Sequence, residues 1–214
     1  MNELDGKLRV AARHGSESEL KLLLNLGCSA LTQDKYGYTA LMLAAKYGHT
    51  ACTSLLLPTS DALTKDGGGY TALMLATRRE HEACVEILLA ASDALATSAD
   101  GWTALMYAVW NGHEACVRIL LQDSDAFAQS DGGMTALMHA AYGGDEECVQ
   151  LLLPVSDVLS KDYKGFTAAA LSRSMGYESI TQLIDAYALA QSEKTGLDAA
   201  VHPGAPRGRA PRRV

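Results

Sequence analysis

The stretch GYTALMLAAKYGH at residues 37–49 decides the fold, because closely similar text recurs along the chain every 32 residues. The later copies begin GYTALMLA at 69, GWTALMYA at 101, GMTALMHA at 133 and GFTAAALS at 165. The same threonine occurs in every copy: Thr39, Thr71, Thr103, Thr135 and Thr167. Self-similarity at a fixed period of this length indicates a repeat architecture.

A second block follows the first in each copy and predicts a second helix. It reads ACTSLLL from 51, ACVEILL from 83, ACVRILL from 115 and ECVQLLL from 147. In the first block Thr39 is a suitable N-cap, because its hydroxyl can accept a hydrogen bond from the first helical turn. Gly48 can end that helix, because glycine adopts a positive φ without penalty. Helices this short are marginal alone in water, so the copies are expected to stack and bury their leucines on one another.

The pattern Asp-x-x-Gly-x-Thr-Ala-Leu-Met-x-Ala-Ala-x-x-Gly-His, followed by Ala/Glu-Cys-Val-x-x-Leu-Leu-Leu, resembles the ankyrin repeat. The resemblance implies an all-α ankyrin-repeat solenoid of about six helix-turn-helix units with short connecting turns. Units 1 to 6 span about residues 3–33, 34–65, 66–97, 98–129, 130–161 and 162–190. We therefore expect one repeat domain over residues 1–190 and a disordered basic tail over residues 191–214.

The chain departs from the usual family pattern, which has Thr-Pro-Leu-His where this chain has Thr-Ala-Leu-Met. Methionine thus replaces a histidine that links neighbouring repeats, and apolar packing is expected instead. The TALM/ECV wording is similar to that of expanded ankyrin-repeat families in some protozoa. In unit 6 the core triplet becomes Ala168-Ala169-Ala170, which predicts a worn C-terminal cap that completes the array.

Charge and composition restrict the class of protein. Of the 214 residues, 48% are hydrophobic and 20% are charged, as in a globular domain. The net charge is -7, with +3 on residues 191–214 and -10 on the rest, which argues against general binding to phosphate backbones. The N-terminus lacks an apolar signal core, and no apolar run has the length of a membrane span. These features predict a cytoplasmic monomer that is not bound to a membrane.

The recurrent polar residues do not predict an active site. The five cysteines include no CxxC pair and, at one per repeat, are expected to be buried free thiols. His49, His81 and His113 also occur once per repeat, so they cannot share one metal ion and are expected to be hydrogen-bonding residues at the loop between the paired helices. Gly67-Gly68-Gly69 is not followed by the Lys-Ser/Thr of a phosphate loop. We therefore expect no enzyme activity, no cofactor and no metal.

Aromatic residues at the variable positions of the repeat carry the strongest functional signal. Tyrosine and tryptophan are enriched at the anchors of protein interfaces. We expect a protein-binding surface along the concave face and the hairpin tips, with His139 as a further contact and with Arg78 and Arg79 forming a cationic patch beside Trp110. The candidate residues are Tyr36, Tyr38, Tyr47, Tyr70, Arg78, Arg79, Trp102, Tyr107, Trp110, His139, Tyr142, Tyr163 and Phe166.

Two other functions remain open at this stage. Stacking rings together with the arginine-rich tail could bind nucleic acid or a nucleotide. The array could also be a scaffold or tether within a cytoskeletal assembly. The first interpretation, a module that binds a protein partner of unknown identity, fits the acidic body best.

Overall fold

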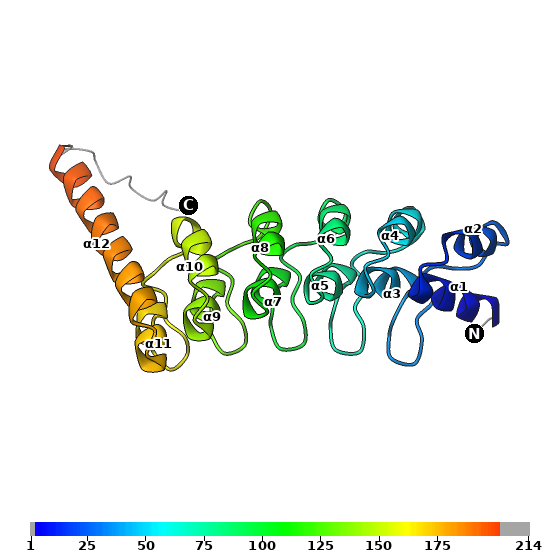
Figure 1. The fold of residues 1–214 in the computed structure, drawn as a ribbon, viewed down its shortest axis with the longest axis horizontal. Helices are drawn as coiled ribbons and strands as arrows, with labels where there is room; N and C mark the ends of the chain where they lie inside the picture. The colour runs from blue at the N-terminus through cyan, green and yellow to red at the C-terminus, as the bar shows by residue number, and fades with distance from the viewer. Residues whose placement is uncertain (1–2, 202–214) are drawn as a thin grey trace, which may run out of the picture.

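The computed structural model describes residues 3–201, and these residues form a single row of helix pairs (Figure 1). The described part is all-helical and contains no strand. Its elements are α1 Glu3–His14, α2 Glu17–Asn25, α3 Ala40–Lys46, α4 Thr50–Leu56, α5 Ala72–Thr77, α6 Glu82–Leu89, α7 Ala104–Trp110, α8 Glu114–Leu120, α9 Ala136–Gly143, α10 Glu146–Leu152, α11 Ala168–Met175 and α12 Glu178–Val201, with short 3-10 helices η1 Leu57–Thr59 and η2 Leu153–Val155. The expected all-α solenoid of six helix pairs is thereby confirmed.

The helices form two layers. The odd-numbered helix of each pair lies beside the hairpin that precedes it, and the even-numbered helix lies in the second layer (Figure 1). We call these the first and second helices of a unit. In units 2 to 6 the threonine hydroxyl caps the first helix, as expected; Thr39 Oγ1 accepts from the Met42 amide at 3.2 Å. The cap defines where each first helix begins, and so fixes which residues of that helix face the core.

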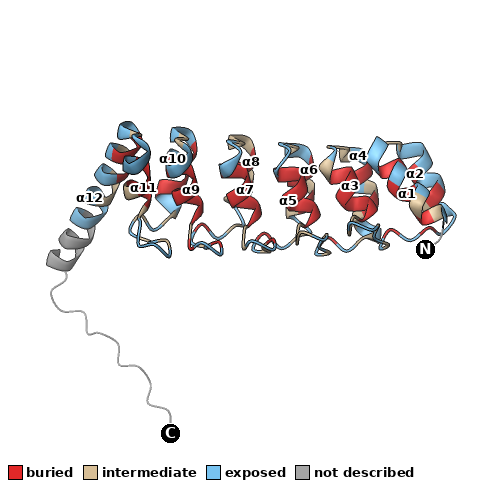
Figure 2. Cartoon of the chain, turned by 90° about the horizontal axis from the view of Figure 1, so that it is seen from below, coloured by how far each residue is buried: buried red, intermediate tan, exposed pale blue. Residues whose placement is uncertain are grey.

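The core is a continuous strip of leucine, alanine and methionine along the first helices. Leu105 and Met106 are at most 1% exposed, and so are the equivalent residues of units 2, 3 and 5. Figure 2 shows this buried strip running through α3, α5, α7 and α9. The methionines pack in the apolar core where the family usually has histidine, and all five cysteines are buried and free. Both expectations are confirmed.

Hydrogen bonds from the other histidines link neighbouring units. His49 Nε2 lies 2.9 Å from the Arg13 carbonyl oxygen, and His81 Nε2 lies 3.2 Å from that of Lys46. At the hairpins, single backbone bonds connect successive tips; the Gly67 amide, for example, donates to the Tyr36 carbonyl at 3.0 Å. The units are therefore tied together on both sides of the first helices.

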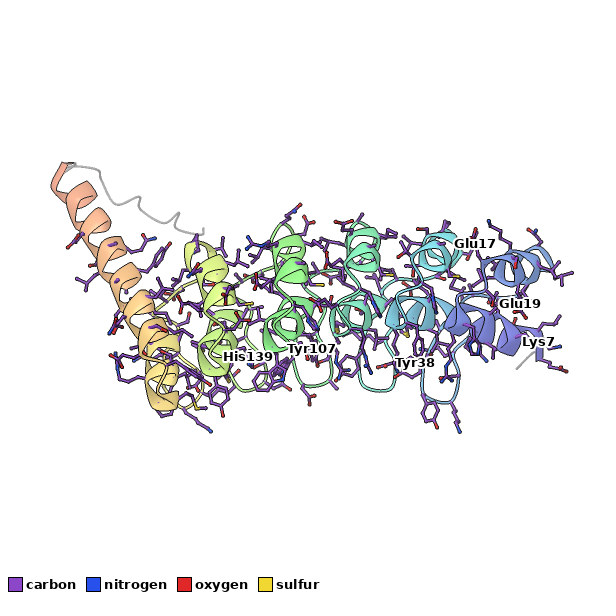
Figure 3. The ribbon with its side chains drawn as sticks, viewed as in Figure 1. Lys7, Glu17, Glu19, Tyr38, Tyr107 and His139 are labelled. Carbon is purple, nitrogen blue, oxygen red and sulfur yellow. The ribbon has the colours of Figure 1, made fainter. Side chains whose placement is uncertain are left out.

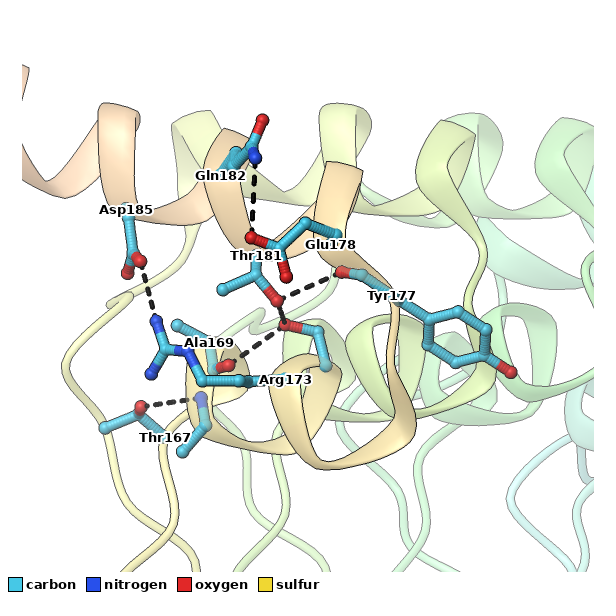
Figure 4. A network of polar contacts seen from close by, with 10 residues as sticks. Thr167, Ala169, Arg173, Tyr177, Glu178, Thr181, Gln182 and Asp185 are labelled. Atoms are coloured by element: carbon cyan, nitrogen blue, oxygen red, sulfur yellow. Dashed lines mark hydrogen bonds and ion pairs between the residues drawn. The ribbon is translucent and has the colours of Figure 1, made fainter.

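In the last unit, polar contacts connect the two helices α11 and α12. The hydroxyls of Ser172 and Thr181 lie 2.8 Å apart in the buried contact between α11 and α12 (Figure 4). The Arg173 guanidinium donates to the Asp185 carboxylate at 2.8 Å across the same pair of helices. Ser172 thus replaces a buried alanine of the other units without leaving its hydroxyl unpaired.

Helix α12 differs from the sequence expectation at its C-terminal end. It continues to Val201, whereas the disordered tail was expected to begin at residue 191. Glu178–Val201 contains no proline, and the first proline after it is Pro203, so the segment lacks the strongest helix breaker. The arginine-rich part of the expected tail, residues 202–214, lies outside the described residues. Within residues 3–201, no helix is both long enough and apolar enough to cross a lipid bilayer.

The loop between the two helices of a unit requires a left-handed residue. Gly48 has φ +73°, and a Cβ there would lie 2.6 Å from the His81 ring of the next unit. Unit 3 has Glu80 at the equivalent place, and Glu80 has φ +58°, the one positive φ outside glycine among the described residues. A non-glycine residue in this conformation costs about 1–2 kcal/mol.

Replacing Glu80 with glycine is therefore expected to stabilise the protein. The gain should be about 0.5–1 kcal/mol, because relief of the left-handed strain exceeds the extra entropy of glycine in the unfolded chain. The matched substitution Gly48→Ala should destabilise by about 2 kcal/mol or more, since it adds both strain and the contact with His81. Chemical denaturation of the three proteins measures both changes. Equal stability of wild type and Glu80→Gly would contradict the strain at Glu80.

Candidate functional site

Three hollows follow one another along the side where the first helices meet the hairpins. We call this surface the hairpin groove. The hollow between units 1 and 2 has a volume of about 400 Å³ and includes Arg13, Lys46 and Tyr47. The next, at units 2 and 3, is about 520 Å³ and includes Lys35 and Arg78. The third, at units 4 to 6, is about 360 Å³ and is lined by Trp102, Trp110, Met134, His139, Tyr142, Asp162, Lys164, Phe166 and Leu171.

One position of the repeat supplies the side chain that overhangs each hollow. It is the seventh residue after the capping threonine, and it reads Lys46, Arg78, Trp110 and Tyr142 in units 2 to 5. This side chain lies over the ring of the residue that precedes the threonine. Lys46 Nζ is 4.4 Å from the Tyr38 ring centroid, and Arg78 Cζ is 4.7 Å from that of Tyr70. In unit 4 the same contact is between two rings, Trp110 and Trp102, at 5.6 Å.

Trp102 is the centre of an aromatic cluster that joins units 3 to 5. Its ring centroid lies 5.1 Å from that of Tyr107, 5.6 Å from that of Trp110 and 4.3 Å from that of His139. Trp110 continues the cluster to Tyr142, whose ring is nearly parallel to it at 6.4 Å. Separations of this size are favourable for aromatic pairs. The structure thus brings together the predicted residues Trp102, Tyr107, Trp110, His139 and Tyr142.

Arg78 marks the boundary between the cationic and the aromatic parts of the groove. Its guanidinium lies over Tyr70 and also 5.3 Å from the Tyr107 ring. The sequence placed Arg78 and Arg79 beside Trp110; the structure places Arg78 on Tyr70 and Tyr107 instead, and Arg79 is exposed just beyond α5. The reason is the register, because the seventh residue of unit 3 reaches Tyr70 of its own unit and Tyr107, the fourth residue after the capping threonine of unit 4.

Tyr107 is a core residue and not an exposed contact, in contrast to the expectation. Its side chain is 7% exposed, and its hydroxyl is hydrogen-bonded to Ser98 Oγ at 3.0 Å and to the Tyr70 hydroxyl at 3.3 Å. Burial raises the pKa of Tyr107 to about 12, with the Tyr70 hydroxyl contributing in the same direction and Ser98 and Arg78 in the opposite one. Tyr107 therefore supports the rings above it.

His139 is likewise buried, at 4% exposure, and forms an inner wall of the third hollow. Figure 3 shows Tyr107 and His139 on neighbouring units of the same layer. Neither ring nitrogen of His139 has a hydrogen-bond partner among the described residues. Burial in these apolar surroundings lowers the pKa of His139 to about 4, so the ring is neutral near pH 7. This burial argues against the direct contact with a partner that was expected for His139.

The other candidate residues line the groove or stand at its edge. Tyr36 is 61% exposed and borders the first two hollows, while Tyr47 is 42% exposed in the first. Phe166 is 45% exposed in the third hollow. Tyr163 is 75% exposed at the tip of its hairpin, where it packs against Gly133, outside the residues that line the hollows described above.

Two groups of surface residues escaped the sequence interpretation. One is the set of groove cations that complete position seven, Arg13 and Lys46, and the period itself could have revealed them. The other is a row of apolar residues, each 54–70% exposed, in the turn that follows the second helix of units 1 to 5: Leu31, Leu63, Leu95, Phe127 and Leu159. A hydrophobic residue that recurs every 32 positions inside a turn is the signal that identifies this row.

The side chains of the groove are suited to non-covalent binding. Burial raises the pKa of Cys52, Cys116 and Cys148, so these thiols stay protonated and unreactive. Among the residues that the structure describes, no three His, Cys, Asp or Glu side chains are grouped so that they could hold a metal ion. The groove offers exposed rings, cations and hollows large enough to take a side chain of a partner.

Comparison with known proteins agrees with this architecture. Residues 8–97 and 59–131 match the family model "Ankyrin repeats (3 copies)", and residues 112–153 match "Ankyrin repeats (many copies)". The chain belongs to the ankyrin-repeat family, whose domains are non-catalytic modules of protein–protein interaction. A search of curated proteins finds no match. Among solved structures, the chain is similar to the ankyrin repeat domain of Bcl-3, described as a unique member of the IkappaB protein family. The TM-score is 0.79 and the identity 26%, over 84% of this chain and 85% of that one.

The neutral, unpaired His139 makes stability depend on pH. The equivalent residue is Leu43, Leu75 or Leu171 in three other units, so His139→Leu is a substitution that the repeat already accommodates. At pH 7 the variant should be more stable by about 1 kcal/mol, because it removes a buried polar group that has no partner.

The advantage of the leucine variant should grow as the pH falls. The folded pKa of about 4 lies below that of an unfolded histidine, so the unfolded chain takes up the proton first. Protonation of His139 therefore leaves the stability of the wild type unchanged above about pH 6.5 and lowers it as the pH falls toward about 4, by about 2 kcal/mol at about pH 5. Urea denaturation of both proteins across this range measures the effect. Parallel curves of stability against pH for the two proteins would exclude it.

Proposed function

We propose that this protein is a protein–protein interaction module that holds its partner in the hairpin groove, with Trp102 and Trp110 as the main anchors. Trp110 is 51% exposed and stands over the third hollow beside Tyr142 and Phe166. Large exposed rings around a hollow are the typical hot spots of protein interfaces. This exposed ring cluster is the observation on which the proposal depends.

The support beneath the rings favours tight binding. The Trp102 amide donates to Ser98 Oγ at 3.3 Å, and its ring packs on the buried Tyr107 and His139. A surface that is already ordered loses little side-chain entropy when a partner binds. The array therefore acts as a rigid scaffold that presents preformed anchors.

The exposed apolar row is the competing surface of the chain. It carries one apolar residue per unit, whereas the groove combines rings, cations and hollows in a continuous arrangement. Combined chemistry of this kind gives specificity as well as affinity. The groove is therefore the better candidate, and the row supplies a control of similar exposure.

The setting of this interaction is also part of the proposal. Five buried free thiols suit a reducing compartment, which supports a cytoplasmic protein. We propose a monomer, since the groove needs no second copy to be complete. Attachment to the cytoskeleton and the kinship with protozoan TALM/ECV variants stay predictions.

Selection of a random peptide library against the full chain tests which surface binds. The variant Trp102→Met/Trp110→Ala should bind the selected peptides with an affinity roughly 30-fold lower or more, as expected when interface hot spots are lost. Methionine is chosen because Met134 occupies the position of Trp102 in unit 5, so the core contact is kept. Fluorescence anisotropy gives the affinities, and circular dichroism verifies that the variant is folded.

The control variant is Phe127→Ala, which removes a ring that is 59% exposed from the apolar row. Its affinities should equal those of the wild type. The proposal is wrong if the selected peptides lose affinity with Phe127→Ala and keep it with the tryptophan double variant.

A further inference from the structure

The groove has two chemically different halves, and from this difference we infer the chemistry of its partner. We infer that the groove binds an extended protein segment that carries acidic side chains over units 1 to 3 and a bulky apolar side chain in the hollow of units 4 to 6. The inference rests on the proposed function and adds to it the charge, the anchor and their spacing.

The strongest observation is the change of residue type at position seven. Arg13 of unit 1, in Ala11-Ala12-Arg13-His14-Gly15, aligns with Lys46 in Ala44-Ala45-Lys46-Tyr47-Gly48. The position therefore reads Arg13, Lys46 and Arg78 through units 1 to 3, and then Trp110 and Tyr142. Arg13 and Lys46 line the first hollow, Arg78 lines the second, and Trp110 and Tyr142 line the third. A segment lying along the row meets three cations and then two rings.

The cations are segregated from the acidic residues of the chain. The first helices of units 2 to 6 contain no Asp or Glu, whereas α6, α8, α10 and α12 all begin with glutamate. In Figure 3, Glu17 of the second layer lies away from the side on which Tyr38, Tyr107 and His139 lie. A body with a charge of -10 thus exposes a row of position-seven cations along one half of its groove, whereas in the other half Lys164 stands beside the acidic Asp162. A strip of one sign attracts and orients a partner of the opposite sign.

The hairpins strengthen this polarity. Asp34 and Asp66 border the cationic half and remain negatively charged, but each directs one carboxylate oxygen to two amides of its own hairpin at 2.8–2.9 Å, which partly offset its charge. Lys35 adds a cation there. In the aromatic half, Asp100 and Asp131 are exposed at the hairpins of units 4 and 5. An acidic side chain is thus attracted at one end of the groove and repelled at the other.

A nucleic acid fits this arrangement less well than a protein segment does. A single strand carries a phosphate at every nucleotide, and binding proteins match it with a groove that is cationic along its whole length. The helices α7 and α9 have neither lysine nor arginine, and the hairpins beside them carry Asp100 and Asp131. A protein segment can place its charges at one end only.

The geometry of stacking sets the spacing within the segment. Packed helices lie about 8–10 Å apart, so the three unit steps from Arg13 to Trp110 span roughly 24–30 Å. An extended chain rises about 3.3 Å per residue. The acidic residues that face Arg78, Lys46 and Arg13 should therefore lie about three, six and eight residues from the anchor.

Synthetic peptides with the full chain test the inference directly. The probe has one phenylalanine and glutamates about three, six and eight residues from it, in Gly/Ser sequence, in both chain directions. Matched peptides carry glutamine or lysine instead of glutamate, and a fourth has the three glutamates directly beside the phenylalanine. The glutamate probe should bind roughly tenfold tighter than the glutamine peptide at low salt, and this ratio should shrink as salt is added. The lysine peptide and the peptide with adjacent glutamates should bind more weakly than the probe.

Charge variants locate the effect. The triple variant Arg13→Gln/Lys46→Gln/Arg78→Gln should lose most of the preference for the glutamate peptide over the glutamine peptide, since Lys35 is the one cation named above in the cationic half that it keeps. The control Lys7→Gln/Lys21→Gln/Arg118→Gln changes the net charge by the same amount outside the groove, where these residues pair with Glu3, Glu17 and Glu114 on their own helices. The control should retain the preference for glutamate.

The outcomes separate this inference from the proposed function. If the glutamine or lysine peptide binds as tightly as the probe and still requires Trp110, the groove binds proteins but the inference about acidity is overturned. The inference is also overturned if the control triple variant loses the preference as fully as the groove variant does, or if an oligonucleotide of deoxythymidine displaces the probe at equal concentration. If Trp110→Ala changes the binding of none of these peptides, the proposed function fails as well.

Discussion

The packing of each first helix against those of its two neighbours is the interaction on which the whole structure depends. The first helices have six to eight residues in units 2 to 6 and would be marginal alone in water. Their leucines, alanines and methionines become almost fully buried only because the next unit covers them. Since units 2 to 5 repeat the same buried leucine, methionine and alanine in the same register, the row can extend without any contact between distant units.

This packing also determines where the variable residues point. With the second, third and fifth positions after the capping threonine buried, the seventh is left at the edge of the hairpin groove. Nothing in the core constrains that seventh residue, so it can be lysine, arginine, tryptophan or tyrosine without altering the stack. The histidine bond to the carbonyl of Arg13 or Lys46 holds the backbone of this same position. The residues that stabilise the stack and those of the proposed binding surface are thus different residues of the same short helix.

The fourth position shows where this separation ends. It is leucine in units 2, 3 and 6, but Tyr107 and His139 in units 4 and 5. Both rings are buried and pack on Trp102, and His139 also contacts Trp110 and has no hydrogen-bond partner among the described residues. A buried unpaired histidine costs stability, and here it fills the floor of the aromatic hollow. The leucine of the fourth position is thus replaced at the place that also carries the exposed rings. Such departures from the local pattern are common at functional sites.

The sequence by itself determined the repeat, its period, the capping threonines, the buried methionines and cysteines and the aromatic residues of interest, because each of these depends on local chemistry repeated at a fixed interval. The tertiary structure alone decided which rings are exposed and what they touch: it buried Tyr107 and His139, placed Arg78 on Tyr70 instead of beside Trp110, and extended α12 to Val201. The physical reason is that the exposure of a side chain in a stacked array is set by the neighbouring unit as much as by its own. The residue type and its position in the repeat therefore do not determine the exposure of a side chain, because exposure also depends on the unit packed beside it.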